Sequence, residues 1–334
     1  FLLKISTADG FSAISEYSLQ PLATEQPTLQ LSCQLSSNFA AVTADDEGRA
    51  ILQILLDPAA KLCGYTLCSQ FDLLRCKVEV AVTGARQLNL ANQLGPLDSS
   101  KPFWPFGPVP ARGSYLLFNH AEWQHKQLQQ LQLQLHWAQL PEHSTGFAGH
   151  YAGYVSDDLQ PPANQSFLAQ LDVLDDGQWQ PLAVPPATAA GCELFASAPD
   201  SERLLSQQQL TFNDVRAFHL DTPQAGAAYH SSASSGFFRL RLSAPAMAFG
   251  HSRYAGALSD TMLYNARHKK PKPLPQPPYV PQLASLSLNY CASTTIDTRQ
   301  DPAPGKRDLL LQLYPFGQRQ SYPSAQRSAV SLLP

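Results

Sequence analysis

The stretch Leu131-Gln132-Leu133-Gln134-Leu135-His136-Trp137 alternates strictly between apolar and polar residues. A period of two places the three leucines and Trp137 on one face of a strand, with the polar residues on the other. Leucine and glutamine both favour helices, but the alternation outweighs that propensity. The stretch therefore predicts a half-buried β-strand, in which Leu133 and Leu135 are buried while Gln132 and Gln134 are more exposed.

Several other stretches carry the same strand signature, bounded by turn residues. In Phe237–Leu242 the apolar residues face inward, and Arg239 and Arg241 face outward. Phe167–Val173 also alternates, and the turn signal Asp175-Asp176-Gly177 and a returning segment follow it, which predicts a hairpin. The remaining predicted strands are 27–34, 50–56, Leu73–Val82 and a segment that opens with Leu283, Ser285, Leu286, Leu288 and Tyr290.

These patterns predict a mainly β protein of tandem β-sandwich-like modules joined by Pro-rich extended connectors. Proline excludes a helix or a central strand from residues 95–114, but Phe103, Trp104 and Phe106 are too apolar for a solvated linker. We expect Phe103–Pro110 to be ordered, with Phe103 or Phe106 in an apolar pocket. The predicted boundaries are a β module at 1–98, an ordered Pro/aromatic connector at 99–112, a β-sandwich-like module at 113–262, a Pro-rich linker at 263–281 and the start of a further, truncated β module at 282–334.

The charge content excludes several classes of partner. Charged residues make up 15% of the chain, against roughly 25% in average proteins, and the formal net charge is −3. A nucleic-acid-binding protein normally carries a basic stripe, so nucleic acid is not expected as a partner. No run approaches 18 uncharged apolar residues, so this chain is not expected to insert into a membrane. The chain begins at Phe1 and ends at Pro334, and we expect it to be a piece of a longer polypeptide.

One local cluster is basic. Arg267, Lys269, Lys270 and Lys272 precede and enter a Pro-rich segment that favours polyproline II. A solvated linker is the expected role of these residues, and a patch that binds phosphate or lipid is the alternative.

A search for chemistry finds no catalytic or cofactor motif. Cys63 and Cys68 form half of a zinc knuckle with no second pair of ligands, so the cysteines are interpreted as small buried hydrophobic residues. His143 and His150 flank a glycine-containing loop, where a surface position is expected. The acid pairs Asp45-Asp46, Asp157-Asp158 and Asp175-Asp176 lie beside turn signals, so they are interpreted as turn residues. We therefore predict no catalytic, cofactor-binding or metal-binding residues and no cofactor.

Aromatic residues are concentrated in the middle of the chain. Such residues either fill a core or dominate a protein–protein surface, and composition does not separate these alternatives. The candidate interface or packing residues are Phe103, Trp104, Phe106, Trp123, Tyr151, Tyr154 and Trp179.

An ordered series of motifs resembles a known family. The motifs are Asn92–Asp98, Lys101–Pro110, Gly113-Ser114, Glu122, Lys126, Leu131–Trp137, Leu140-Pro141, His150–Tyr154, Asp176–Trp179, Gly236–Leu240, Phe249–Tyr254 and Leu283–Tyr290. Across roughly residues 90–320 this series resembles the baseplate wedge components of phage-tail-like extracellular contractile injection systems, which are often called baseplate J-like or phage baseplate proteins.

The resemblance implies a structural protein without catalytic residues. Its implied partners are other baseplate, spike, tube or sheath subunits, and its implied location is the cytoplasm during assembly, within a phage-tail-like particle that can later be released. Rigid β modules, and connectors that lose little entropy on assembly, are compatible with this role. The alternative from another class is a carbohydrate-binding or glycan-processing β-sandwich, because aromatic rings can stack on sugars. A cleft lined by tryptophan with two carboxylates would favour that alternative.

Overall fold

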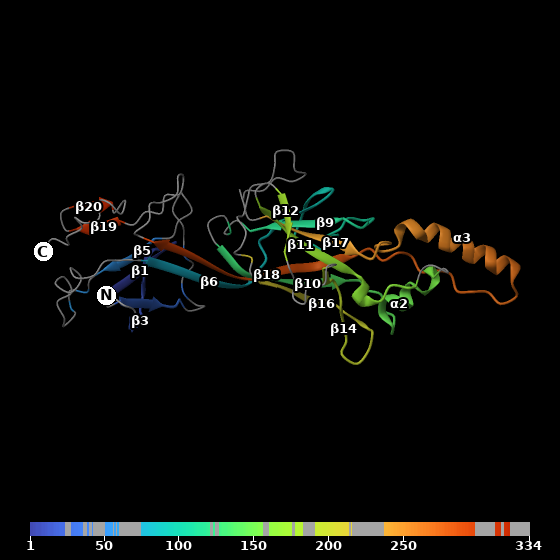
Figure 1. Ribbon diagram of the computed structural model, residues 1–334, viewed down its shortest axis with the longest axis horizontal. Coiled ribbons are helices and arrows are strands. Elements are labelled where there is room, and N and C mark those ends of the chain that lie inside the picture. Colours follow the sequence, from blue (N-terminus) through green and yellow to red (C-terminus); the bar gives the residue numbers. More distant parts are fainter. Residues whose placement is uncertain are drawn as a thin grey trace. The chain divides into compact units, whose positions relative to one another are not determined.

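The computed structural model describes most of the chain, and Figure 1 shows its path. The described residues are 1–23, 28–35, 39, 42, 51–55, 57, 59, 75–120, 123, 127–155, 160–175, 178–182, 191–213, 215, 237–297, 311–314 and 317–320. The predicted turn at 176–177, the segment 121–127 apart from Trp123 and Gln127, and the Cys63-Cys68 pair lie outside them.

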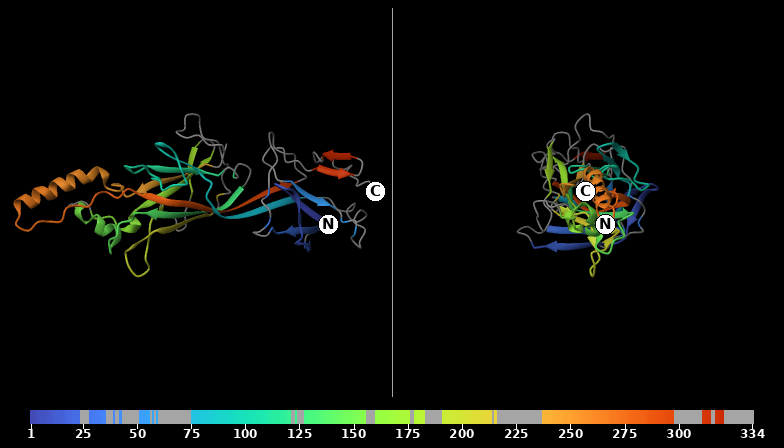
Figure 2. Two further views of the ribbon diagram at one scale, coloured as in Figure 1. Left: turned by 180° about the vertical axis from the view of Figure 1, so that it is seen from behind. Right: turned by 90° about the vertical axis from the view of Figure 1, so that its right-hand side faces the viewer.

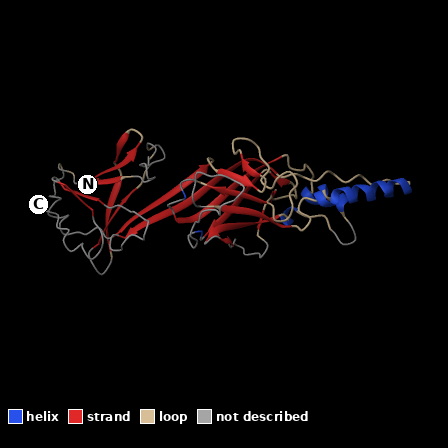
Figure 3. Ribbon diagram, turned by 90° about the horizontal axis from the view of Figure 1, so that it is seen from above, coloured by secondary structure: helices blue, strands red, loops and turns tan. Residues whose placement is uncertain are grey.

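The fold is mainly β, as predicted, and the strand pairs whose register the structure describes are antiparallel. Figure 3 shows strands over most of the described chain and one long helix. The chain divides into two compact units. Unit 1 comprises Phe1–Cys76 and Ile296–Pro334, and unit 2 comprises Lys77–Thr295.

Unit 1 contains a small three-stranded sheet and two hairpins. The sheet has the order β2-β1-β5, formed by β1 (Leu2–Thr7), β2 (Gly10–Ile14) and β5 (Leu52–Leu55). Leu3 of β1 and Ile14 of β2 are its buried apolar residues. The hairpins are β3 (Tyr17–Leu22) with β4 (Thr28–Cys33), and β19 (Leu311–Tyr314) with β20 (Gly317–Gln320).

The first sheet of unit 2 is built around the alternating stretch Leu131–Trp137. Its order is β16-β10-β18-β6, with β6 at Arg75–Ala85, β10 at Gln127–Ala138, β16 at Gln207–Asn213 and β18 at Gln282–Asp297. Leu131, Leu133, Leu135 and Trp137 are at most 2% exposed, whereas Gln134 and His136 are exposed and Gln132 is half-buried. The predicted strand and its buried face are therefore confirmed.

The pairing of β10 with β18 includes a β-bulge that the sequence explains. Leu286, Leu288 and Tyr290 follow a period of two, but Leu283 stands three residues before Leu286. Trp137 pairs with Leu283 and His136 with Ser285, so one extra residue lies between the two pairs. The bulge keeps both Leu283 and Leu286 on the buried face. This sheet combines β10 and β16, which lie in the predicted module 113–262, with β18, which begins in the predicted module 282–334.

The second sheet of unit 2 contains the strands formed by the other two alternating stretches, Phe167–Val173 and Phe237–Leu242. Its path is β12-β11-β17-β9-β7-β8, with β13 also paired to β11. The hairpin of β11 with β12 is confirmed, since Asp175 pairs with Gln178. The bounds are β7 (Asn89–Asn92), β8 (Gly95–Leu97), β9 (Tyr115–Asn119), β11 (Leu168–Asp175), β12 (Gln178–Pro181), β13 (Cys192–Glu193) and β17 (Phe238–Ala244).

One continuous core lies between the inner faces of the two sheets of unit 2. Leu133 and Leu288 enter it from the first sheet, and Leu171 and Leu240 from the second. All four side chains are at most 1% exposed. The two-layer arrangement is that of a β-sandwich, in which each sheet buries one face against the other.

Short elements and one helix complete unit 2. The short elements are the hairpin of β14 (Ala196–Ser197) with β15 (Leu204–Leu205) and the short helices α2 (Gly146–His150), η2 (Ala152–Tyr154) and η3 (Asn164–Ser166). The long helix is α3 (His251–Arg267). Figure 1 and the rear view in Figure 2 both show α3 running away from the sheets, with the following segment returning beside it. The sequence patterns did not predict this helix.

Candidate functional site

Most of the aromatic residues singled out from the sequence lie in the interior of unit 2. Five of the seven are at most 6% exposed: Phe103, Phe106, Trp123, Tyr151 and Tyr154. The exceptions are Trp104, which is 47% exposed, and Trp179, which is half-buried. The structure therefore assigns the five buried rings to packing within this chain.

The connector around Phe103 is ordered without regular secondary structure. The backbones of Phe103 and Leu283 exchange two hydrogen bonds of 3.0 and 2.9 Å. The side chain of Asn92 donates to the Trp104 carbonyl at 3.0 Å, and that of Gln93 donates to the Phe106 carbonyl at 2.7 Å. These bonds and the burial of Phe103 and Phe106 confirm the prediction for Phe103–Pro110. They also leave the Trp104 ring facing solvent.

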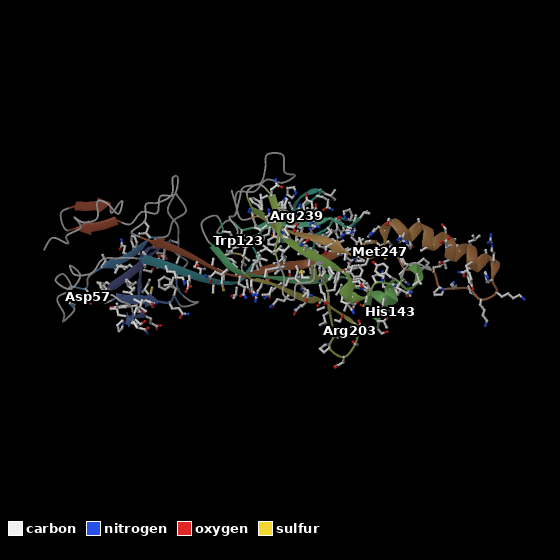
Figure 4. All side chains as sticks on the ribbon, in the orientation of Figure 1. Asp57, Trp123, His143, Arg203, Arg239 and Met247 are labelled. Atoms are coloured by element: carbon white, nitrogen blue, oxygen red, sulfur yellow. The ribbon has the colours of Figure 1, made fainter. Side chains whose placement is uncertain are left out.

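Trp123 lies between the two sheets rather than at a surface. Its ring meets Phe238 and Tyr290 edge-on, with ring centroids 5.4 and 5.7 Å away, and Phe118 also packs on it. Figure 4 labels Trp123 among the strands of unit 2. Its indole nitrogen has no hydrogen-bond partner among the residues that the structure describes. A ring that is 0% exposed does not stack on a sugar, so Trp123 does not support the glycan alternative.

The outer face of the second sheet carries an ion cluster that sequence reasoning missed. The Asp172 carboxylate accepts hydrogen bonds from Arg239 at 2.7 and 3.0 Å and from Arg241 at 3.0 Å. Asp172 is 2% exposed, and the two guanidinium groups cover it. Arg239 also lies 4.5 Å from the centre of the Trp179 ring. These contacts link β11 to β17 and, through Trp179, to β12, and loss of one charge would leave its partners without a counter-charge.

A second aromatic cluster anchors the short helices. The Tyr151 hydroxyl donates to the Phe249 carbonyl at 3.0 Å, and the Tyr279 hydroxyl donates to the Ala138 carbonyl at 3.0 Å. Burial raises the pKa of both phenols well above the usual value for tyrosine. The phenols therefore stay protonated and act as hydrogen-bond donors rather than as acids or bases.

The long helix and its return segment form a projection from this cluster. We define the arm as residues 250–281, which contain α3 and the Pro-rich stretch after it. At its base, Tyr254 stacks on Tyr154, whose hydroxyl donates to the Gln276 carbonyl at 2.7 Å. The His150 ring nitrogen Nε2 hydrogen-bonds the Pro277 carbonyl at 3.0 Å. Both limbs of the arm are thus fixed to η2 and α2.

Two glycines allow this close approach. A Cβ on Gly153 would come within 2.7 Å of the Pro275 Cα, so only glycine lets the return limb pack there. Gly250 precedes α3 with φ +80°, in the left-handed region that favours glycine. The arm base is therefore specified locally by sequence. His251, Tyr254, Leu258, Thr261 and Asn265 of α3 are half-buried and stand three or four residues apart. Only Tyr254 and Leu258 of this set are apolar, so the sequence carried a short apolar period as the signal for α3.

The described residues offer no grouping typical of a metal centre. No three or more His, Cys, Asp or Glu side chains come together among them in a way that could hold a metal ion. His143 instead accepts a hydrogen bond from the backbone of Thr145 at 3.2 Å. The Cys192 thiol donates to the Ala169 carbonyl at 3.2 Å, and burial raises its pKa to about 12. That thiol is therefore a packing group at neutral pH.

The helices within the described ranges also include none that is long and apolar enough to cross a membrane. No curated protein matches this chain. The family model described as "Baseplate protein PVC11-like" matches residues 3–318, and so extends the resemblance noted for roughly 90–320 almost to the first residue. A match over nearly the whole length shows the family: the chain belongs to the PVC11-like baseplate proteins, components of phage-tail-like contractile injection systems.

Proposed function

We propose that this chain works as a structural subunit that assembles the baseplate through protein–protein interfaces with other baseplate, spike, tube or sheath subunits. The observation that carries the proposal is the family match over residues 3–318. Membership makes the chain part of a phage-tail-like particle. We further propose that assembly takes place in the cytoplasm and that the chain contributes no turnover and no bound cofactor.

The distribution of side chains supports an architectural role. The rings that could have lined a binding cleft, such as Trp123 and Tyr151, are used inside the sandwich. A buried ion cluster and a hydrogen-bonded connector hold the second sheet and the Phe103 segment in place. Rigid parts of this kind bind with a small loss of conformational entropy, which favours assembly.

Deletion of the gene in a producing strain tests the proposal. We expect electron microscopy of the deletion strain to find no complete contractile particles, and a plasmid copy of the gene to restore them. Normal, firing-competent particles in the deletion strain would exclude the assembly role. Saturable glycan hydrolysis by the purified chain, lost on substitution of its carboxylates, would replace the proposal with the glycan alternative.

A further inference from the structure

The arm has two limbs, and a histidine stands where each limb is attached to the rest of unit 2. His251 is the first residue of α3, directly after Gly250. His150 is the last residue of α2, and its Nε2 donates a hydrogen bond to the Pro277 carbonyl of the return limb at 3.0 Å. The protonation states of these two rings therefore act on both attachments of the arm.

His251 contains a buried nitrogen without a partner. Its Nδ1 is shielded from water and has no hydrogen-bond partner among the residues that the structure describes. Protonation of the ring places an N–H donor and a positive charge at this atom, whichever tautomer the neutral ring adopts. A buried donor or charge without a partner costs free energy, and the start of a helix is the positive end of its dipole. Burial accordingly lowers the pKa of His251.

His150 is also held in an environment that favours the neutral ring. Its ring lies edge-on to that of Tyr151, with centroids 4.8 Å apart. Burial lowers the pKa of His150, and the nearby His143 lowers it further. The hydrogen bond to the Pro277 carbonyl acts in the opposite direction but does not outweigh burial. Binding of a proton to His150 therefore weakens the attachment of the return limb.

No group in the described part of the chain supplies a counter-charge to either ring. Burial raises the pKa of the surrounding phenols of Tyr151, Tyr154 and Tyr279, so these stay neutral. No described Asp or Glu shifts the pKa of either histidine. The charged residues of the arm itself are all exposed and do not shift those pKa values either: Arg253, Asp260, Arg267, Lys269, Lys270 and Lys272.

We propose that the arm is released by acid, because protonation of His150 and His251 detaches both limbs from α2 and η2 while the sandwich stays folded. The buried core of the sandwich contains no histidine among its described residues. Once detached, α3 loses its helical structure, since isolated helices of 17 residues are marginal in water. Acid release of the arm goes beyond the proposed structural function and does not depend on it.

The direction of the pH dependence follows from the lowered pKa of each histidine. A ring whose pKa is lower in the attached arm than in the detached arm binds its proton more readily after release, so falling pH favours release. At pH 5.5, about one unit below the ordinary histidine pKa of about 6.5, each ring that stays neutral in the attached arm favours release by up to about tenfold. At pH 7.5 both rings are neutral in either state, and the arm stays attached.

Hydrogen exchange of the purified full chain at pH 7.5 and 5.5, followed by mass spectrometry, tests this release. Each rate is divided by the intrinsic exchange rate at its pH, so that only opening is compared. We expect peptides from α3 to exchange at least about fivefold faster at pH 5.5, and peptides from β10 and β11 to change less than about twofold. Equal protection of α3 at the two pH values, or an equal rise in β10 and β11, would overturn the proposal.

Variants identify the rings that respond. His150→Gln/His251→Gln removes both titrations, and glutamine can still donate to the Pro277 carbonyl, so we expect the exchange of α3 to differ less than about twofold between the two pH values. The control His136→Gln lies on the exposed face of β10 and should keep the wild-type response. A response that persists in the double variant but is lost in His268→Gln would place the sensor at the tip of the arm and contradict the proposal.

A measurement on the wild-type chain decides the assignment even where the double variant does not fold. Proton NMR follows the imidazole Cε1–H signals during a pH titration, and the single variants His150→Gln and His251→Gln assign them. We expect both rings to titrate below about pH 6.5. Titration of both rings at or above that value would show that the attached arm does not resist their protonation, and acid release would be refuted.

Discussion

Removing the charge of Asp172 tests the ion cluster that joins the strands of the second sheet. Asp172→Asn preserves the size of the side chain but leaves the guanidinium groups of Arg239 and Arg241 without a counter-charge. Loss of one partner of a buried ion pair costs about 3–5 kcal/mol, because the remaining charge is uncompensated. The side chains of Arg239 and Arg241 are 21% and 32% exposed, so water compensates part of this loss.

We therefore expect a loss near the lower end, about 3 kcal/mol of unfolding free energy. For a unit of about 200 residues this lowers the unfolding midpoint by roughly 6–12 °C. Circular dichroism of the full chain during heating measures the shift. Asp98→Asn is the matched control, because Asp98 pairs with Lys101 at the surface and such pairs contribute less than about 1 kcal/mol.

A compensating variant separates lost charge from lost shape. Asp172→Leu/Arg239→Met/Arg241→Met replaces the cluster with apolar groups and should recover most of the stability lost in Asp172→Asn. If Asp172→Asn unfolds within about 1 kcal/mol of wild type, the cluster does not hold the strands together and the reasoning from its burial is wrong.

Three further predictions concern the core, the connector and the arm base. Leu133→Asp should destabilise unit 2 by several kcal/mol, because it buries an unpaired charge, whereas Gln134→Asp on the exposed face should cost less than about 1 kcal/mol in urea unfolding. Phe106→Ala should cost about 3–5 kcal/mol, and Trp104→Ala two residues earlier should be nearly neutral by the same assay. Burial lowers the pKa of His150, so the unfolded chain binds the proton more readily and stability should fall as pH drops below about 6.5; His150→Gln should flatten this dependence between about pH 7.5 and 5.5, and an unchanged slope would contradict it.

The positions of the strands could be predicted from the sequence, but the pairing of the strands could not. Alternation in Leu131–Trp137 and Phe167–Val173 depends only on local spacing, and these strands form where predicted. The pairing of β10 with β18 joins residues about 150 positions apart, and nothing in the period of either strand selects that partner. The sequence likewise contained the spacing of α3, but its Gly, Ser and Thr residues lower helix propensity and concealed it.

The candidate site was less predictable than the fold. Aromatic composition does not distinguish a core from an interface, and burial places Phe106 and Trp123 in the core while Trp104 faces solvent. The ion cluster had a signal, since Arg239 and Arg241 alternate with buried residues on β17 and Asp172 sits likewise on β11. Recognising it required knowing that these two strands are neighbours.

The location of this chain within the particle tests the central claim most directly. An epitope tag on the chain in a producing strain, followed by immunogold electron microscopy of purified particles, measures that location. A structural baseplate subunit predicts label at one end of each particle, retained after washing. Purified, firing-competent particles that carry no label while the tagged chain is found only in the soluble fraction would contradict the claim.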